Sequence, residues 1–322
     1  MSSGEGPVVP VLEVGGTHVT AACVDVGTRD LRGGRSFRET VDGDSSAGDI
    51  VSALVHCAAR LSVRGPARWA VALPGPFDHE RGIGRYEGVG KFDALRGFDL
   101  RAALTSALPG ASGVSFWNDA DAFVLGEWWA GAARGHRRAV GITLGTGVGS
   151  CFLRDGRIVR QGPGVPPDGR LHTLRYADAP LEETVSRRAL RRAYARFSGQ
   201  PPPDVREIAR RARQGDRAAA GVFAGAFRVL GSVLGPFVAA FEPTVLVVGG
   251  AVAGAWDLVA EPLRAGLAEA GGRARDGCPA VTPARQPARA PLLGAAYLTT
   301  AYGRAAASDR SKTPARQERD AG

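Results

Sequence analysis

The chain has 322 residues, 44% of them hydrophobic, so it is long enough for two ordinary domains with their own cores. Its formal net charge is +9, but lysine stands only at Lys91 and Lys312, and the other basic residues are scattered arginines. We interpret this charge as solvated helix faces and expect no nucleic-acid partner. The four cysteines form no CxxC pair, and no signal-peptide pattern opens the sequence, so the expected location is the cytoplasm.

The N-terminal half begins with a glycine hairpin. An apolar strand over 8–14 runs into the turn Gly15-Gly16-Thr17, and a second apolar strand follows at once. Apolar runs and helical spacing then predict a strand within 31–40, a helix over 47–62, a strand over 68–73, a helix over 99–107, a strand over 113–117 and a helix over 120–130. Strands alternate with helices, so the predicted fold class is α/β.

The second half opens on a second glycine hairpin. A strand over 139–144 leads into Gly145-Thr146-Gly147, and the chain returns to apolar residues without a helix. This excludes the dinucleotide fingerprint and the Walker loop, because both open a helix. The elements expected beyond it are a helical block over 181–196, two helices within 203–240, a strand over 244–248 that ends in Gly249-Gly250, and helices over 258–268 and 292–302.

The longest apolar stretch, 221–241, contains Arg228 and four glycines. Small residues suit a tightly packed internal helix, so we predict a core helix there and no membrane partner.

The two hairpins are separated by 130 residues, counted from Gly15 to Gly145. A similar unit repeated at domain spacing indicates a duplicated architecture with two related lobes. Taken singly, each hairpin is more often a plain turn. Two opposed glycine hairpins can instead grip a polyphosphate, because bare backbone amides in a tight turn attract anions.

Polar or glycine residues follow three apolar strands directly, at Asn118-Asp119, at the second hairpin and at Gly249-Gly250. Ligands of α/β proteins collect at such strand ends. Asp119 is the candidate general base for a hydroxyl, although an Asp at this position is also a preferred helix cap. Gly249-Gly250 is either a plain turn or a place where backbone approaches a base or ribose.

Five motifs, in this order and spacing, resemble those of the ROK family of repressors and sugar kinases: Gly15-Gly16-Thr17, Pro74-Gly75-Pro76, Asn118-Asp119-Ala120-Asp121-Ala122, Gly145-Thr146-Gly147-Val148-Gly149 and Val247-Val248-Gly249-Gly250. The resemblance covers about residues 8–302. It implies a two-lobed actin-like ATPase fold, a ribonuclease H-like duplication with the active site in the interlobe cleft. The expected segments are a disordered tail over 1–7, an N-terminal α/β lobe over 8–117, a C-terminal α/β lobe with a helical insert over 118–302, and a disordered tail over 303–322.

The resemblance also implies roles for single residues. It makes Asp119 the base on a sugar hydroxyl. It assigns the sugar contacts to Asn118, Gly75, His172 and Glu182. It assigns ATP to Gly15, Gly16, Thr17, Gly145, Thr146, Gly147, Gly249 and Gly250.

The chain departs from the family pattern at several positions. Glu13 stands where the family usually has an Asp near Mg²⁺. Gly90 stands where the family has an Asn against the sugar, and the neighbouring Lys91 could compensate. Arg170 replaces a Glu upstream of His172. No cysteine occurs over 169–183, so no structural zinc is expected.

The function that follows from the resemblance is an ATP-dependent hexose kinase, most like a glucokinase, with Mg²⁺ and a hexose as partners. The family's habit suggests a homodimer. The alternative is a non-catalytic, sugar-sensing regulator on the same scaffold, without the DNA-binding domain of the family's repressors. The altered positions Glu13, Gly90 and Arg170 favour this alternative.

Overall fold

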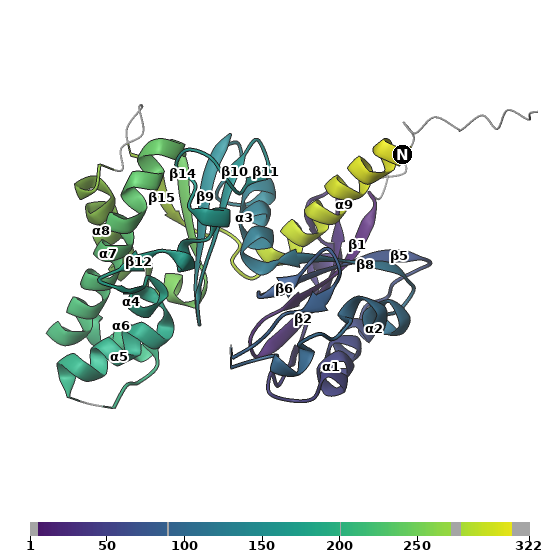
Figure 1. Ribbon diagram of the computed structural model, residues 1–322, viewed down its shortest axis with the longest axis horizontal. Coiled ribbons are helices and arrows are strands. Elements are labelled where there is room, and N and C mark those ends of the chain that lie inside the picture. Colours follow the sequence, from purple (N-terminus) through teal and green to yellow (C-terminus); the bar gives the residue numbers. More distant parts are fainter. Residues whose placement is uncertain (1–5, 89, 200, 272–277, 311–322) are drawn as a thin grey trace, which may run out of the picture.

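The computed structural model describes residues 6–88, 90–199, 201–271 and 278–310, with side chains up to residue 301. The chain forms two α/β lobes that stand side by side, each built on its own mixed β-sheet (Figure 1).

The sheet of the N-terminal lobe has the strand order β3-β2-β1-β5-β8, with β4 paired to β2. Its strands are β1 (Val8–Val14), β2 (His18–Asp25), β3 (Asp30–Leu31), β4 (Phe37–Thr40), β5 (Ala67–Leu73) and β8 (Ala111–Asn118). β1 and β2 form the first glycine hairpin, and β1, β5 and β8 run parallel. A small hairpin, β6 (Phe77–Asp78) and β7 (Ile83–Gly84), follows β5.

The sheet of the C-terminal lobe repeats this plan with the order β11-β10-β9-β14-β15. Its strands are β9 (Arg138–Leu144), β10 (Val148–Arg154), β11 (Arg157–Val159), β14 (Val245–Gly249) and β15 (Ala280–Pro283). The first three pair antiparallel, and the last two are added in parallel, as in the other lobe. The duplicated architecture predicted from the two hairpins is therefore confirmed.

A helical insert fills the other side of the C-terminal lobe. It begins with a two-stranded sheet of β12 (Arg175–Tyr176) and β13 (Ala179–Pro180). Its helices are α4 (Glu182–Val185), α5 (Arg187–Ser198), α6 (Val205–Arg213), α7 (Arg217–Phe241) and α8 (Trp256–Glu269). The single block predicted over 181–196 is divided at Ser186, because the buried Ser186 side chain accepts the Ala189 N–H and caps α5.

The long helix α7 is, by length and composition, the one helix in the described residues that could cross a membrane. Half of its most apolar window is buried, and it lies against α8 (Figure 1). A Cβ on Gly231 of α7 would lie 2.3 Å from the Leu263 carbonyl oxygen of α8, so the two backbones touch. The structure thus has a tightly packed helix where the sequence predicts a core helix.

The N-terminal sheet is covered on both faces. Successive residues of a strand point to opposite faces of the sheet. On one face, Leu12 and Val14 pack with α1 (Ala47–Ala59) and α2 (Leu100–Ala107). On the other face, Val9 and Val11 pack with α9 (Ala290–Arg310). The sequence placed the last helix in the C-terminal lobe, whereas α9 contacts β1 and β5 (Figure 1).

The final helix is also longer than expected. The segment predicted as a tail from 303 onward is helical up to Arg310, and Ala305, Ala306 and Ala307 are strong helix formers. The rest of that tail, and residues 1–5 of the other, lie outside the described residues.

The lobes are joined by α3 (Asp119–Ala130), which packs closely on α9. A Cβ on Gly126 would lie 1.9 Å from the Ala290 carbonyl oxygen, and a Cβ on Gly294 would lie 1.7 Å from that of Ala122. The helices therefore meet backbone against backbone, which only glycine permits at these two positions.

We expect Gly126→Ala to lower the free energy of unfolding by about 2 kcal/mol, because the added methyl group overlaps α9. The matched control is Gly221→Ala on α7, where nothing lies within 4 Å of the added carbon. This control should raise the stability by up to about 1 kcal/mol, through helix propensity alone. Urea denaturation of both variants measures the difference, and equal effects of the two changes would contradict the close crossing.

Candidate active site

Asp119 begins α3 directly after β8 ends at Asn118. The cap of this helix is Asn118, whose side-chain oxygen accepts the Asp121 N–H at 3.3 Å. The sequence left open whether Asp119 is a cap or a base. Because Asn118 performs the capping, the carboxylate of Asp119 is left with one local hydrogen bond, from the Ala120 N–H at 2.8 Å.

Two carboxylates meet at this edge of the sheet. Since β1, β5 and β8 are parallel, their carboxyl ends lie together, and Glu13 lies next to the last residue of β1. Partial burial and the charge of Asp119 raise the pKa of Glu13 from 4.5 to about 7. The hydrogen bond with the Thr20 hydroxyl lowers this pKa and so offsets part of the rise. Burial also raises the pKa of Asp119, which Lys91 and Arg170 partly counteract.

This pair suits a divalent cation. Neighbouring carboxylates that repel each other are relieved by a bound metal ion, and carboxylate oxygens are the protein ligands of Mg²⁺. Glu13 has the acidic group that the family pattern places there, one methylene further out. Within the described residues, no group of three or more His, Cys, Asp or Glu residues could hold a metal ion.

The first glycine hairpin lies beside these carboxylates. Its last ladder pair is Val14 with Val19, and the Gly15 N–H donates to the His18 carbonyl oxygen at 2.8 Å. Gly16 and Thr17 therefore form the tip, beyond the ladder. The side chain of Lys91 lies against this tip, with Nζ 3.6 Å from the place of a Cβ on Gly16.

The second glycine hairpin reaches the same place from the other lobe. A Cβ on Gly149 would lie 2.7 Å from that of Ala120, so β10 passes next to the first turn of α3. At the tip, the Gly145 N–H donates to the Gly147 carbonyl oxygen at 3.0 Å, and Thr146 is exposed. Both hairpins thus adjoin Asp119, one through each lobe.

Glu182 and His172 lie near the second hairpin. Glu182 Oε2 accepts the Val148 N–H at 3.1 Å, and a Cβ on Gly147 would lie 2.6 Å from that oxygen. Burial and Arg170 lower the pKa of His172, while the charge of Glu182 raises it. The loop that carries His172 is held by Ser150, whose hydroxyl donates to the Gly169 carbonyl at 2.7 Å and accepts the Leu171 N–H at 2.9 Å.

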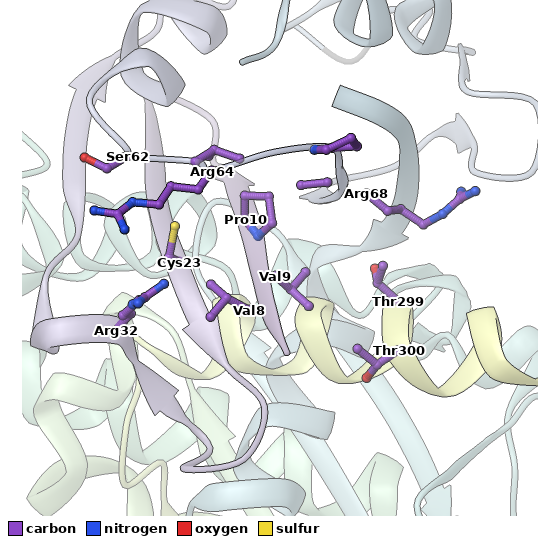
Figure 2. Close-up of a pocket in the computed structure, with 13 residues that line it drawn as sticks. Val8, Val9, Pro10, Cys23, Arg32, Ser62, Arg64, Arg68, Thr299 and Thr300 are labelled. Atoms are coloured by element: carbon purple, nitrogen blue, oxygen red, sulfur yellow. The ribbon is translucent and has the colours of Figure 1, made fainter. Parts of the chain in front are cut away.

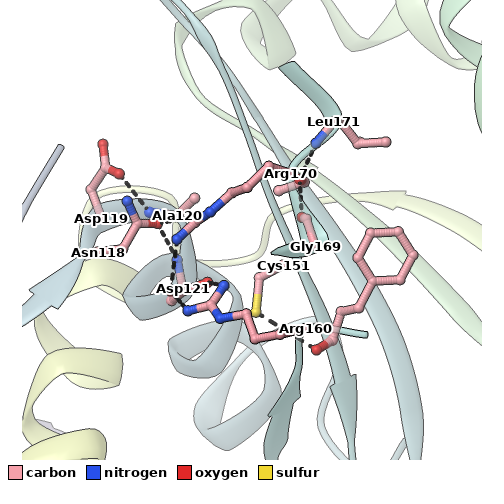
Figure 3. Close-up of polar contacts among 11 residues, drawn as sticks. Asn118, Asp119, Ala120, Asp121, Cys151, Arg160, Gly169, Arg170 and Leu171 are labelled. Carbon is pink, nitrogen blue, oxygen red and sulfur yellow. Dashed lines mark hydrogen bonds and ion pairs between the residues drawn. The ribbon is translucent and has the colours of Figure 1, made fainter. Parts of the chain in front are cut away.

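Arg170 reaches from this loop to Asn118 (Figure 3). Its Nη1 donates to Asn118 Oδ1 at 2.8 Å, and its Nη2 lies 3.6 Å from Asp121 Oδ2. The oxygen of Asn118 is therefore used twice, by Arg170 and by the Asp121 N–H. The carboxamide has only its NH₂ donors left for a ligand.

The buried carboxylate of Asp121 holds a second arginine, Arg160, through both of its oxygens (Figure 3). Sequence reasoning missed Arg160, because it stands 39 residues from Asp121 in an unremarkable strand-loop segment.

His79 was also missed, and its Nε2 is the one buried side-chain polar atom without a hydrogen bond in the described part of the chain. Burial lowers the pKa of His79 to about 4, so the ring is neutral beside Asp121, Arg160 and Arg170.

Gly75 follows the strand between β1 and β8, so it lies at the same sheet edge as Glu13 and Asp119. The Tyr86 hydroxyl donates to the Pro74 carbonyl at 2.6 Å and fixes this segment. Burial and the charge of Asp119 raise the pKa of Tyr86, which is consistent with its nearness to that carboxylate.

Gly249 and Gly250 have a packing role. A Cβ on Gly249 would lie 2.2 Å from the Phe123 ring, and one on Gly250, at φ +85°, 2.3 Å from the Leu144 carbonyl oxygen. The structure explains both glycines by the close approach of β14 to α3 and β9. Their contact with adenosine stays a prediction.

A cavity of about 310 Å³ lies elsewhere, at the amino-terminal ends of β1 and β5 (Figure 2). It is lined by residues of β1, β2, β5 and α9 and by arginines, among them Arg64 and Arg68. None of the predicted site residues lines it.

The raised pKa of Glu13 gives a pH-dependent contribution to stability. Because folding disfavours the ionised form, this contribution is present below pH 4.5 and is lost as the pH rises through about 7. We therefore expect Glu13→Gln to raise the free energy of unfolding at pH 8, by about 2 kcal/mol relative to its effect at pH 4.5. Urea denaturation at both pH values, with the exposed Glu80→Gln as control, measures this. A pH-independent effect of Glu13→Gln would refute the buried pair.

Comparison with known proteins agrees with this geometry. The family model of the ROK family matches residues 10–301. A glucokinase of Thermotoga maritima is 28% identical over 277 residues, which cover 79% of this chain and 84% of that protein. The crystal structure of a ROK hexokinase from Thermus thermophilus has a TM-score of 0.72 and 30% identity, and the match covers 92% of this chain and all of that one.

The same fold also serves regulation. A ROK family transcriptional regulator, a homologue of the E. coli MLC protein, gives a TM-score of 0.71 at 20% identity, over 91% of this chain and 78% of that one. The two-lobed actin-like fold is thus shared by kinases and regulators. The family match over nearly the whole chain is decisive for membership, and the chain belongs to the ROK family.

Proposed function

We propose that this chain is an ATP-dependent hexose kinase, most like a glucokinase, with Asp119 as general base. The observation that carries the proposal is the place of Asp119. Its neighbour Ala120 contacts the second glycine hairpin, and Lys91, at the tip of the first hairpin, acts on its charge. Asn118, and not Asp119, caps the helix.

The chemistry is an in-line transfer. The sugar hydroxyl oxygen forms a bond to the γ-phosphorus of ATP, the bond from that phosphorus to the bridging oxygen breaks, and ADP leaves with the electron pair. Asp119 takes the hydroxyl proton, and partial burial strengthens it as a base. Mg²⁺, held by Glu13, would neutralise phosphate charge.

Other side chains orient the reactants. The NH₂ group of Asn118 donates to an oxygen of the sugar, because Arg170 and the Asp121 N–H engage its oxygen. We assign Gly75, His172 and Glu182 to the hexose. The amides at the tips of the two hairpins, Gly15-Gly16-Thr17 and Gly145-Thr146-Gly147, hold the phosphates. Gly249 and Gly250 border the adenosine.

We place the protein in the cytoplasm, as its cysteine usage suggests, and we expect a homodimer from the family resemblance. The second candidate is a sugar-sensing regulator without turnover. A specific observation favours it: Arg170 takes the place of the family's acidic residue and binds Asn118 directly.

We expect Asp119→Asn to lower kcat at least 10³-fold without lowering the melting temperature, because the carboxamide cannot accept the proton. A coupled assay of ADP release with a panel of hexoses measures this. The control is Asp44→Asn in an exposed loop, which should keep full activity. Wild-type protein that turns over no hexose but is stabilised by one would favour the sensor.

Arg170→Met should raise the KM for the sugar about tenfold and change kcat less, because the Asn118 carboxamide loses the partner that fixes its orientation. Arg170→Lys should recover part of the affinity. The exposed Arg157→Met serves as control. Should Arg170→Met bind sugar more tightly than the wild type, the arginine would be an obstruction and not a positioning residue.

A further inference from the structure

Lys91 lies at the tip of the first hairpin, next to tightly packed residues. The Phe92 N–H next to it donates to the Gly43 carbonyl oxygen at 2.6 Å. The buried rings of Phe92 and Tyr86 lie 5.6 Å apart and anchor the segment on both sides. A Cβ on Gly43 would lie 3.2 Å from that of Lys91, and Lys91 Nζ lies over Gly16.

No carboxylate of the described residues pairs with the ammonium of Lys91. Over residues 6–88, 90–199, 201–271 and 278–310, it forms no ion pair or hydrogen bond, in contrast to Arg160 and Arg170, which bind Asp121 and Asn118. It is nevertheless partly buried and close enough to Asp119 for its charge to act on that carboxylate. A partly desolvated cation without a partner among these residues is suited to an anionic ligand.

The Lys91 ammonium therefore lies next to the tip of the first hairpin, Gly16-Thr17, and its charge acts on the Asp119 carboxylate. Resting on the proposed function, we propose that Lys91 binds the phosphoryl group during its transfer. The sequence had suggested a sugar contact for Lys91. A neutral hydroxyl gains little from an ammonium, whereas the charge spread over the phosphoryl oxygens in the transition state gains much.

In this role Lys91 takes part in no proton transfer. It donates hydrogen bonds to the equatorial oxygens of the phosphoryl group while the sugar oxygen replaces the bridging oxygen. The proton of the sugar hydroxyl goes to Asp119. Lys91 also offsets the two nearby carboxylates, Glu13 and Asp119, which would otherwise repel the phosphate.

The test compares Lys91→Met, Lys91→Arg and the wild type. Isothermal titration calorimetry measures binding of ADP and of a non-hydrolysable ATP analogue, and steady-state assays measure kcat and the sugar KM. Lys91→Met should weaken binding of the triphosphate analogue about tenfold and of ADP less than twofold. It should lower kcat about 10²-fold and leave the sugar KM within twofold, and Lys91→Arg should recover part of kcat.

The matched control is Arg96→Met, which removes an exposed cation of the same segment that pairs with Glu87. It should leave all four quantities unchanged. A rise in the sugar KM alone, or equal losses for ADP and the triphosphate analogue, would overturn the role of Lys91.

The same measurements separate this proposal from the proposed function. If the wild type binds the triphosphate analogue but turns over no hexose, kinase activity fails, and the comparison of the two nucleotides still decides on Lys91. If the wild type binds neither nucleotide, both proposals fail.

Discussion

The site depends on how the hydrogen bonds of one side chain, Asn118, are distributed. Its oxygen closes the first turn of α3 through the Asp121 N–H and also accepts from Arg170. Two consequences follow at once. Asp119 is freed from the role that an acidic residue at a helix start normally has, and the carboxamide of Asn118 keeps its NH₂ donors for other partners. A carboxylate with one local hydrogen bond and an amide donor therefore stand next to each other at the end of β8.

The charged groups around Asn118 and Asp119 differ in how deeply they are buried and in how they are paired. Glu13 and Asp119 repel each other in a partly buried place, and Asp121, further in, is saturated by arginines. On the side of the first hairpin, Lys91 brings positive charge close to Asp119, and Arg38 acts on Glu13. Without a ligand, the repulsion between the two carboxylates is not fully offset. A magnesium-bound polyphosphate would bring positive charge to the carboxylates and negative charge to Lys91.

The sequence predicted the parts that depend on local pattern. Apolar runs broken by glycine identified both hairpins and the repeated strand plan, and the strand ends identified Asn118 and Asp119. Long-range contacts could not be predicted. Nothing local to 292–302 shows that this helix lies on β1 and β5, and nothing near Asp121 indicates Arg160 or the neutral His79. Glycines were ambiguous for another reason, since Gly250 meets a carbonyl oxygen that only the folded chain brings close.

The position of α9 has a consequence for how the protein is made. The face of the N-terminal sheet that contains Val9, Val11 and Ala70 is completed by Leu292, Leu293 and Ala296, near the other end of the chain. During synthesis this apolar surface stays uncovered until the whole C-terminal lobe has been produced. The first lobe therefore cannot finish folding before the second, and the nascent chain is exposed to aggregation for most of its translation.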